Sequence, residues 1–373
     1  MELQRYINNN EDYLTCMRDQ GIRVNSFKRL KILSYPYVKD GSPTSMDETW
    51  KLLIRGAIVS SDNKIVCLPP CKAYDLLTHE GPTRSTSDEK ISYEHLIDGT
   101  MINLFHYNDE WLISTRSEIG GYNKWDNKKS FRQMFDECSK LHYESLDKNM
   151  SYSFVMRHTE NRNVSPIKEN ELFLCEVYDY SGDTIRRLDQ SEYPENNYSV
   201  NESYTNQDEF MKKYQGPCIH YATKGYTIKV ASKRYKWINP YFEEVKALKI
   251  NMNNHLMNYI ELRRNGQLKK YLRYFPEHQH IFTNYQEIIH SISNELHTTY
   301  KNVFVHKTME RKDIPFHLKP LIYDIHGLYL ETKEPTTWSI VKDYIHTVPT
   351  KKLVFALNHM KKRGSTEKTK LVI

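Results

Sequence analysis

The stretch that decides the fold is Ser92-Tyr93-Glu94-His95-Leu96-Ile97-Asp98-Gly99-Thr100-Met101-Ile102-Asn103-Leu104. Asp98-Gly99 has the composition of a turn, and the apolar run that follows it is typical of a strand. This run, Thr100–Tyr107, and the next one, Glu110–Thr115, flank Asn108-Asp109. The pattern therefore predicts a β-hairpin directly after the Asp98-Gly99 turn.

Further short β-like runs lie on both sides of this stretch. Leu52–Val59 and Lys64–Leu68 flank a polar turn and predict a second hairpin, and Cys218–Tyr221 with Thr227–Val230 predicts a third strand pair. Residues 151–157 and 171–178 are also strand-like. Helical spacing occurs in residues 1–27 and in Phe131–Leu141, where Ser130 is a suitable N-cap.

After Pro240 the β pattern gives way to helical patterns. They cover residues 241–264, 284–305, 317–330, 338–346 and 351–363. The sequence therefore predicts an α+β chain, with antiparallel sheets and flanking helices around a cleft in residues 1–240. An all-helical domain is predicted over 241–364 and a flexible tail over 365–373.

Positive charge is concentrated in the C-terminal third. The chain has 53 Lys+Arg and 47 Asp+Glu, and residues from 240 onward hold 21 of the former and 13 of the latter. This imbalance indicates a polyanion partner such as RNA, or alternatively a solvated helical surface. No apolar run reaches the roughly 18 to 20 residues that span a bilayer, so a soluble intracellular protein without a membrane partner is expected.

Between residues 50 and 240, the order of motifs resembles the covalent nucleotidyltransferase superfamily of RNA ligases, DNA ligases and mRNA capping enzymes. Phage-type RNA ligases and their relatives in large DNA viruses are the most similar branch. The segments that carry the resemblance are Arg55-Gly56, Lys72–Asp75, Leu96–Gly99, Trp111–Arg116, Tyr152–Val155 with Glu160–Arg162, Gln215–Ile219, and Thr227–Lys229 with Tyr235.

The resemblance also shows where this sequence departs from the family. In the family motif Lys-x-Asp-Gly, the lysine attacks the α-phosphate of ATP and carries AMP as a phosphoramidate; here that position is Leu96, which has no lone pair. A ribose- or metal-binding glutamate is replaced by Val155, a metal-binding glutamate by Gln215 and a paired lysine by Thr227. An alternative alignment places the first of these glutamates on Glu176.

What remains of the family pattern is suited to binding an anion. The nucleotide- and phosphate-binding residues that the resemblance implies are Arg55, Lys72, Asp98, Gly99, Arg116 and Lys229. The implied ligand is ATP or another nucleotide, whereas the lost carboxylates disfavour a Mg²⁺ site. The resemblance thus implies a catalytically degenerate RNA-ligase homologue, not an enzyme, that binds nucleotide or RNA ends in the old active-site cleft.

Two alternatives remain open. An active ATP-dependent RNA ligase or capping-type enzyme would need a relocated nucleophile, such as Lys72, Lys90 or His95, although His95 would lie on the other face of its strand. A structural protein-interaction module would have its cleft filled by Leu96 and Val155, and would bind a protein partner.

Electrostatic geometry separates these hypotheses. A ligand site requires four cations to converge on one cleft: Arg55, Lys72, Arg116 and Lys229. The relatives in large DNA viruses further imply a viral origin and a cytoplasmic site of action, in the cytoplasm of the host.

Overall fold

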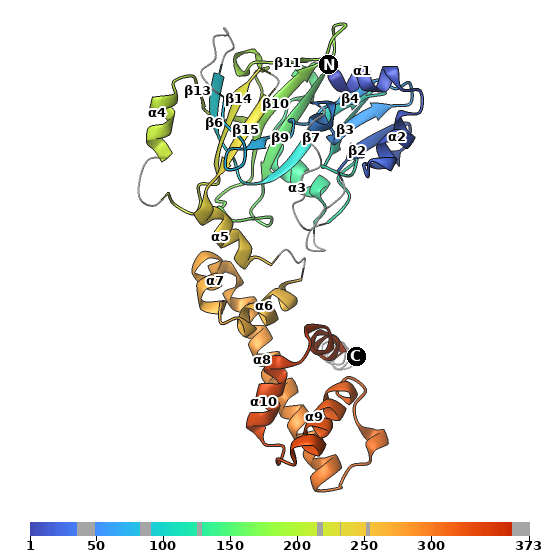
Figure 1. Cartoon of the computed structure of the whole chain (residues 1–373), viewed down its shortest axis with the longest axis vertical. Coiled ribbons are helices and arrows are strands. Elements are labelled where there is room, and N and C mark those ends of the chain that lie inside the picture. Colours follow the sequence, from blue (N-terminus) through green and yellow to red (C-terminus); the bar gives the residue numbers. More distant parts are fainter. Residues whose placement is uncertain are drawn as a thin grey trace, which may run out of the picture. The chain divides into compact units, whose positions relative to one another are not determined.

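The computed structural model describes residues 1–35, 49–82, 91–124, 129–214, 219–231, 233–250 and 254–359. The chain groups into two compact units, of which the first is Met1–Lys246 and the second begins at Ala247. The first unit is built on three β-sheets with short helices, and the described part of the second is helical (Figure 1). The predicted α+β fold class is confirmed.

The first sheet is antiparallel and is covered by the N-terminal helices. Its strands, in spatial order, are β1 (Arg23–Phe27), β2 (Leu30–Ser34), β3 (Arg55–Ser60) and β4 (Ile65–Cys67). Apolar side chains of α1 (Glu2–Asn9) and α2 (Tyr13–Asp19) pack with this sheet and with the 3-10 helix η1 (Thr49–Leu53). The hairpin β3–β4 is as predicted, but residues 1–27 are not one helix, because the chain becomes extended at Asn10 and again from Arg23.

The second sheet contains the hairpin that follows Asp98-Gly99. Its main path is β11 (Arg186–Arg187), β10 (Glu171–Asp179), β9 (Met150–Arg157), β7 (Thr100–Tyr107) and β8 (Glu110–Ser114), and β12 (Ser199–Val200) pairs with β10. Asn108 and Asp109 both have positive φ, at 49° and 60°, which is the conformation of a type I′ turn. The predicted strands and hairpin are confirmed.

Helix α3 (Phe131–Cys138) packs its buried residues against the second sheet. Ser130 is its N-cap, as predicted, and forms a capping box with Gln133. The reciprocal bonds satisfy backbone donors at the start of the helix, which is why the helix begins at Phe131.

The third sheet brings together strands from distant parts of the unit. Its order is β13 (Ser203–Tyr204), β6 (Ile91–His95), β14 (Gly225–Val230), β15 (Lys233–Ile238) and β5 (Tyr74–Asp75), and α4 (Gln207–Met211) follows β13. The predicted pairing of 218–221 with 227–230 is wrong, because β14 pairs with β15 and β6 and the described residues 219–224 form no strand. Ala231, at φ 48°, begins the turn from β14 to β15.

The second unit consists of helices in its described part. They are α6 (His255–Arg264), α7 (Leu268–Tyr274), α8 (Gln279–Tyr300), the π-helix η6 (Lys301–Val305), α9 (Lys319–Thr332), α10 (Trp338–Thr347) and a helical segment over 350–359. The helix predicted over 241–264 is divided, since α5 (Pro240–Leu248) ends before Asn254 caps α6. None of the helices in the described ranges is both long and apolar enough to cross a bilayer.

Candidate anion-binding site

The pairing of β6 with β14 fixes which side chains share a face of the third sheet. Thr227 lies opposite Glu94, and the Leu96 N–H donates to the Gly225 carbonyl at 2.9 Å. Side chains alternate along a strand, so Leu96 lies on the face that Glu94 and Lys229 share. At the position where the family resemblance expects a nucleophile, this face therefore carries a leucine.

His95 lies on the opposite face. Its Nδ1 is 2.5 Å from the Tyr214 hydroxyl, and its ring packs near Phe210 and Tyr204. Burial lowers the pKa of His95, with a further contribution from Lys213. The aromatic setting of this ring, away from the Leu96 face, does not favour it as a substitute nucleophile.

Lys229 is buried and is held by acceptors of the protein. Its Nζ lies 2.8 Å from Glu94 Oε1 and 3.8 Å from Glu176 Oε2, and it donates to the Cys175 carbonyl at 3.1 Å. Glu176 Oε1 accepts from the Tyr178 hydroxyl at 2.8 Å, whereas Oε2 is buried without a hydrogen bond among the described residues. This ammonium therefore serves an internal ion cluster, not an open surface.

Arg234 connects this ion cluster to the rest of the site. It lies opposite Lys229 in the β14–β15 register, and its Nε donates to Thr227 Oγ1 at 3.1 Å. Burial alone would raise the pKa of Glu176, but Lys229, Arg234 and Arg187 outweigh it and lower that pKa. Thr227 in turn donates to the Tyr235 carbonyl at 2.7 Å. Thr227, at the position where the family resemblance expects a lysine, therefore accepts a hydrogen bond from Arg234 of the next strand.

Three of the predicted cations, Arg55, Lys72 and Arg116, lie together, and we call them the cationic group. Gly56 brings the backbone of β3 against the loop after β8, since a Cβ at Gly56 would lie 2.9 Å from the Arg116 carbonyl oxygen. The Lys72 N–H donates to the Leu52 carbonyl at 2.8 Å. The Lys72 Nζ lies 5.3 Å from the centre of the Tyr35 ring, within the range of a cation–π contact.

The cationic group has an excess of positive charge. Burial, followed by the charges of Arg234 and Arg116, lowers the pKa of Arg55 to about 10. Burial and then Arg55 lower the pKa of Lys72. The Arg55 side chain is half-buried, and none of the three side chains has a hydrogen bond or ion pair with any residue that the structure describes. Such an arrangement favours a bound anion.

Asp98 and Gly99 lie in a different setting. Asp98 is buried, and its Oδ2 accepts from the N–H groups of Val164 and Ser165 at 2.9 and 3.0 Å. Its Oδ1 lies 3.8 Å from Lys224 Nζ. Gly99 allows a close approach of strands, because a Cβ there would lie 2.5 Å from the Met156 carbonyl oxygen and 2.6 Å from Val155 Cγ1. These contacts make both residues parts of the framework.

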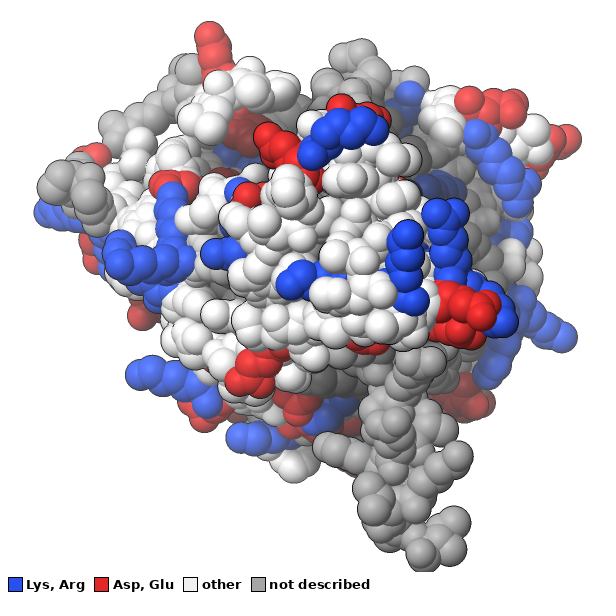
Figure 2. Space-filling model, turned by 90° about the horizontal axis from the view of Figure 1, so that it is seen from below, with Lys and Arg blue, Asp and Glu red and all other residues white. Residues whose placement is uncertain are grey.

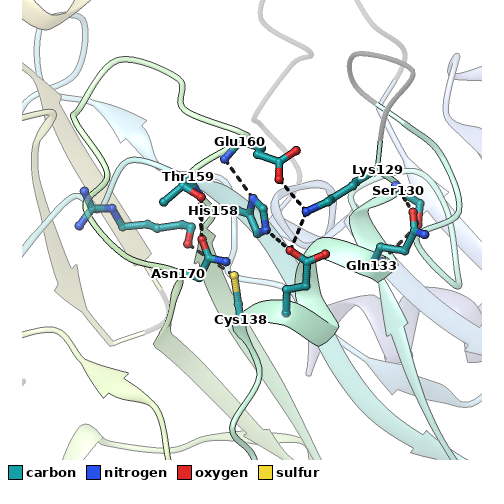
Figure 3. Close-up of polar contacts among 10 residues, drawn as sticks. Lys129, Ser130, Gln133, Cys138, His158, Thr159, Glu160 and Asn170 are labelled. Carbon is teal, nitrogen blue, oxygen red and sulfur yellow. Dashed lines mark hydrogen bonds and ion pairs between the residues drawn. The ribbon is translucent and has the colours of Figure 1, made fainter. Parts of the chain in front are cut away.

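The loop that follows β9 supplies the two backbone donors to Asp98. Hydrogen bonds and ion pairs connect this loop to α3 (Figure 3). Buried His158 lies with Nε2 2.9 Å from Glu137 Oε2, and its Nδ1 accepts from the Glu160 N–H at 3.1 Å. Lys129 Nζ bridges Glu137 and Glu160 at 2.9 and 2.6 Å. Because Val164 and Ser165 follow directly on this loop, the network helps to position the two donors of Asp98.

Replacement of Asp98 by asparagine is expected to destabilise the first unit by roughly 1 to 3 kcal/mol. The amide has only one acceptor oxygen and would turn an N–H₂ group toward the Asn163 amide and Lys224. Urea denaturation followed by far-UV circular dichroism measures the loss. Asp136→Asn on α3 is the matched control, since its half-exposed pair with Arg132 should contribute little; equal losses in the two variants would contradict the framework role of Asp98.

The structure also places the positions at which the sequence departs from the family pattern. Val155 is buried against Gly99, and Gln215 lies outside the described residues. The carboxylates that do lie beside Lys229 are Glu94 and Glu176. Glu176 was the alternative suggested by the sequence, whereas Glu94 and Arg234 were missed. Their signal was the alternation of polar residues on β6 and β15 at positions that face Lys229.

Metal ligation has no evident basis in the described ranges. They contain no group of three or more His, Cys, Asp or Glu side chains placed to hold a metal ion. The basic side chains of the site fall into two groups: Lys229 and Arg234 lie at the buried carboxylates, whereas Arg55, Lys72 and Arg116 form the cationic group.

Comparison with known proteins gives a distant likeness to ligases. A putative ATP-dependent DNA ligase from Aquifex aeolicus is 14% identical over 74% of this chain and 72% of its own, with a TM-score of 0.38. An archaeal ATP-dependent RNA ligase (form 1) is 11% identical over 77% of this chain and 73% of its own, with a TM-score of 0.39. No family model matches the sequence, and no curated protein matches it. A likeness at this level identifies neither a shared activity nor a shared ligand.

Proposed function

We propose that this chain binds a nucleotide or the phosphate-bearing end of an RNA at the cationic group, without forming a covalent nucleotide adduct. The observation that carries the proposal is the convergence of Arg55, Lys72 and Arg116 without a carboxylate partner among the described residues. Arginine binds phosphate through paired N–H donors, and lysine contributes a point charge. Arg234 adds to the positive potential at Arg55.

The non-covalent part of the proposal depends on Leu96. This residue lies on the face of Glu94 and Lys229, and its side chain cannot attack a phosphate. Lys229 is fully engaged by Glu94, Glu176 and the Cys175 carbonyl. Among the residues proposed at the outset, only the cationic group is therefore left open to a ligand.

The first experiment separates binding from catalysis. Purified protein is incubated with α-labelled ATP or GTP and Mg²⁺ or Mn²⁺, and then denatured. We expect no labelled band, together with retained binding of ATP or of a 5′-phosphorylated RNA in a filter assay. A label that survives denaturation would overturn the non-covalent proposal and would direct the search for a nucleophile to Lys224. Burial lowers the pKa of Lys224, and its Nζ lies 3.8 Å from Asp98.

Replacement of Arg55 by glutamine is expected to weaken ATP binding about tenfold or more, because a charge-assisted hydrogen bond contributes roughly 1.5 to 3 kcal/mol. Isothermal calorimetry measures the change. Arg18→Gln is the matched control, since Arg18 is exposed on α2, outside the cationic group. If both variants bind as the wild type does, the cationic group is not the ligand site, and the structural-module alternative gains support.

A further inference from the structure

Four planar groups are stacked on the surface of the helical unit. The Phe304 and His326 rings have centroids 3.8 Å apart and an interplanar angle of 14°, and the Tyr329 ring continues the stack 6.0 Å from His326 at 21°. The Arg311 guanidinium lies 5.3 Å from the centre of the Phe304 ring. These four residues, Arg311, Phe304, His326 and Tyr329, which we call the aromatic stack, come from η7 (Arg311–Asp313), η6 and α9.

Local contacts fix the inner part of the stack. The Tyr300 hydroxyl lies 3.5 Å from His326 Nδ1, and its ring packs against Phe304. Phe304 belongs to a π-helix, which is a rare form of helix and is often found at functional sites. Burial, and to a smaller extent Arg311, lower the pKa of His326. Both effects favour the neutral imidazole, which can stack as an uncharged ring.

The outer end of the stack is open to solvent. Tyr329 is 38% exposed, and other large apolar residues of η6 and α9 are exposed as well: Val305, Tyr323, Leu328 and Leu330. Exposed rings of this kind present a face on which an unpaired base can stack. A patch of exposed apolar residues also fits a protein partner, so the charge of the surroundings must decide between the two.

The turn beside the stack is basic. Between Lys301 and Lys312 the sequence has four Lys+Arg and one Asp+Glu. Within the part of the chain that the structure describes, Lys301 and Lys307 have no ion pair, whereas Lys312 pairs with Glu310 at 2.8 Å. On the face seen in Figure 2, Lys and Arg side chains, with Asp and Glu side chains between them, stand among and around a broad uncharged area. Lysine is depleted in protein–protein interfaces, while planar rings with unpaired cations suit a polyanion with bases.

We infer that the aromatic stack, through the exposed ring of Tyr329 and the cations Arg311, Lys301 and Lys307, is a platform for single-stranded nucleic acid. Bases would stack on Tyr329, and phosphates would lie against the basic turn. The inference deepens the proposed function, because it rests on nucleic acid being the ligand. It adds a second contact surface, which takes the strand and not its terminal phosphate.

The test uses the full chain and a fluorescent oligouridylate, with binding followed by anisotropy. Tyr329→Leu keeps an apolar side chain but removes the ring, and we expect a loss of affinity of roughly fivefold or more, as for one stacked base. Tyr329→Phe keeps the ring and should bind as the wild type does. Arg311→Gln should reduce the slope of log affinity against log salt by about 0.7, the value for one lost phosphate contact of a single strand.

The outcomes separate this inference from the proposed function. Unchanged oligouridylate affinity in Tyr329→Leu overturns the platform, and an equal loss in Tyr329→Phe does so too, because stacking needs only the ring. A concentration-dependent dimer that Leu330→Ser dissolves, with RNA affinity unchanged, would also overturn it and assign the patch to a contact between copies. The proposed function has its own readout, since ATP binding should depend on Arg55 and be unaffected by Tyr329→Leu.

Discussion

Replacement of Lys229 by methionine should destabilise the first unit by about 3 kcal/mol or more, the cost of removing one partner from a buried ion pair. The methionine leaves Glu94 without its partner at 2.8 Å and Glu176 without its partner at 3.8 Å. The repulsion between the two carboxylates is then no longer offset by the ammonium. Both carboxylates are buried. Urea denaturation followed by far-UV circular dichroism gives the change in the free energy of unfolding.

The loss should depend on pH in a defined direction. Burial raises the pKa of Glu176 and Lys229 is the first of the charges that lower it, so the removal of Lys229 raises this pKa in the folded state. A carboxyl group with a raised folded-state pKa costs stability above that pKa and costs less as it becomes protonated. The Lys229→Met variant should therefore be less impaired at pH 5 than at pH 8.

Two further variants make this prediction specific. Lys236→Met removes a lysine from the same strand pair. The Lys236 Nζ lies 3.8 Å from Asp75 Oδ2, and both side chains are about one-third exposed, so a loss of less than about 1 kcal/mol is expected. Lys229→Met combined with Glu94→Gln should recover part of the stability, because it also removes one of the unpaired charges. Equal losses for Lys229→Met and Lys236→Met would show that the ion cluster is not a framework element.

Replacement of Gly225 by alanine should destabilise the same unit by about 3 kcal/mol, with contributions from backbone strain and from overpacking. Gly225 has φ +142°, and a Cβ there would lie 2.0 Å from the Trp237 carbonyl oxygen and 3.0 Å from Ile238 Cα. Both contacts are backbone atoms of β15, so the collision can be relieved only by moving the strand. Thermal unfolding of the variant measures the effect.

Gly21 provides the control for this prediction. Its φ is +77°, but a Cβ there would have nothing within 4 Å, so Gly21→Ala carries the strain without the collision and should cost about 1 kcal/mol. The difference between the two variants isolates the close approach of β14 and β15. If Gly225→Ala lowers the stability no more than Gly21→Ala does, then β14 and β15 do not approach each other closely at Gly225.

Local patterns in the sequence were sufficient for much of the fold. The turn residues Asn108 and Asp109 tolerate positive φ, and Ser130 with Gln133 is a complete capping box. In both places the signal and the structure lie within a few residues of each other. The boundary within 241–264 was missed because apolar spacing continued through a region where Asn254 begins a new helix.

The candidate site could be predicted only in part, because it depends on which strands become neighbours. Arg55, Lys72 and Arg116 were identified through the order of motifs, and the structure brings them together. Arg234 was missed because β15 was not recognised as a strand. The prediction grouped Lys229 with the open cations, since the sequence does not reveal that Glu94 lies across from its strand.

The charges of Arg55, Lys72 and Arg116, which have no carboxylate partner among the residues that the structure describes, also make thermal stability a means of finding the ligand. In the absence of an anion these side chains repel one another, since Arg116 adds to burial and to Arg234 in lowering the pKa of Arg55. A ligand that binds only the folded chain adds about 2.7 kcal/mol at a concentration one hundred times its Kd. A melting-temperature screen of nucleotides, phosphorylated oligonucleotides and simple phosphates would thus rank ligands without any assay of activity, and Arg55→Gln would report which of the shifts arise at this group.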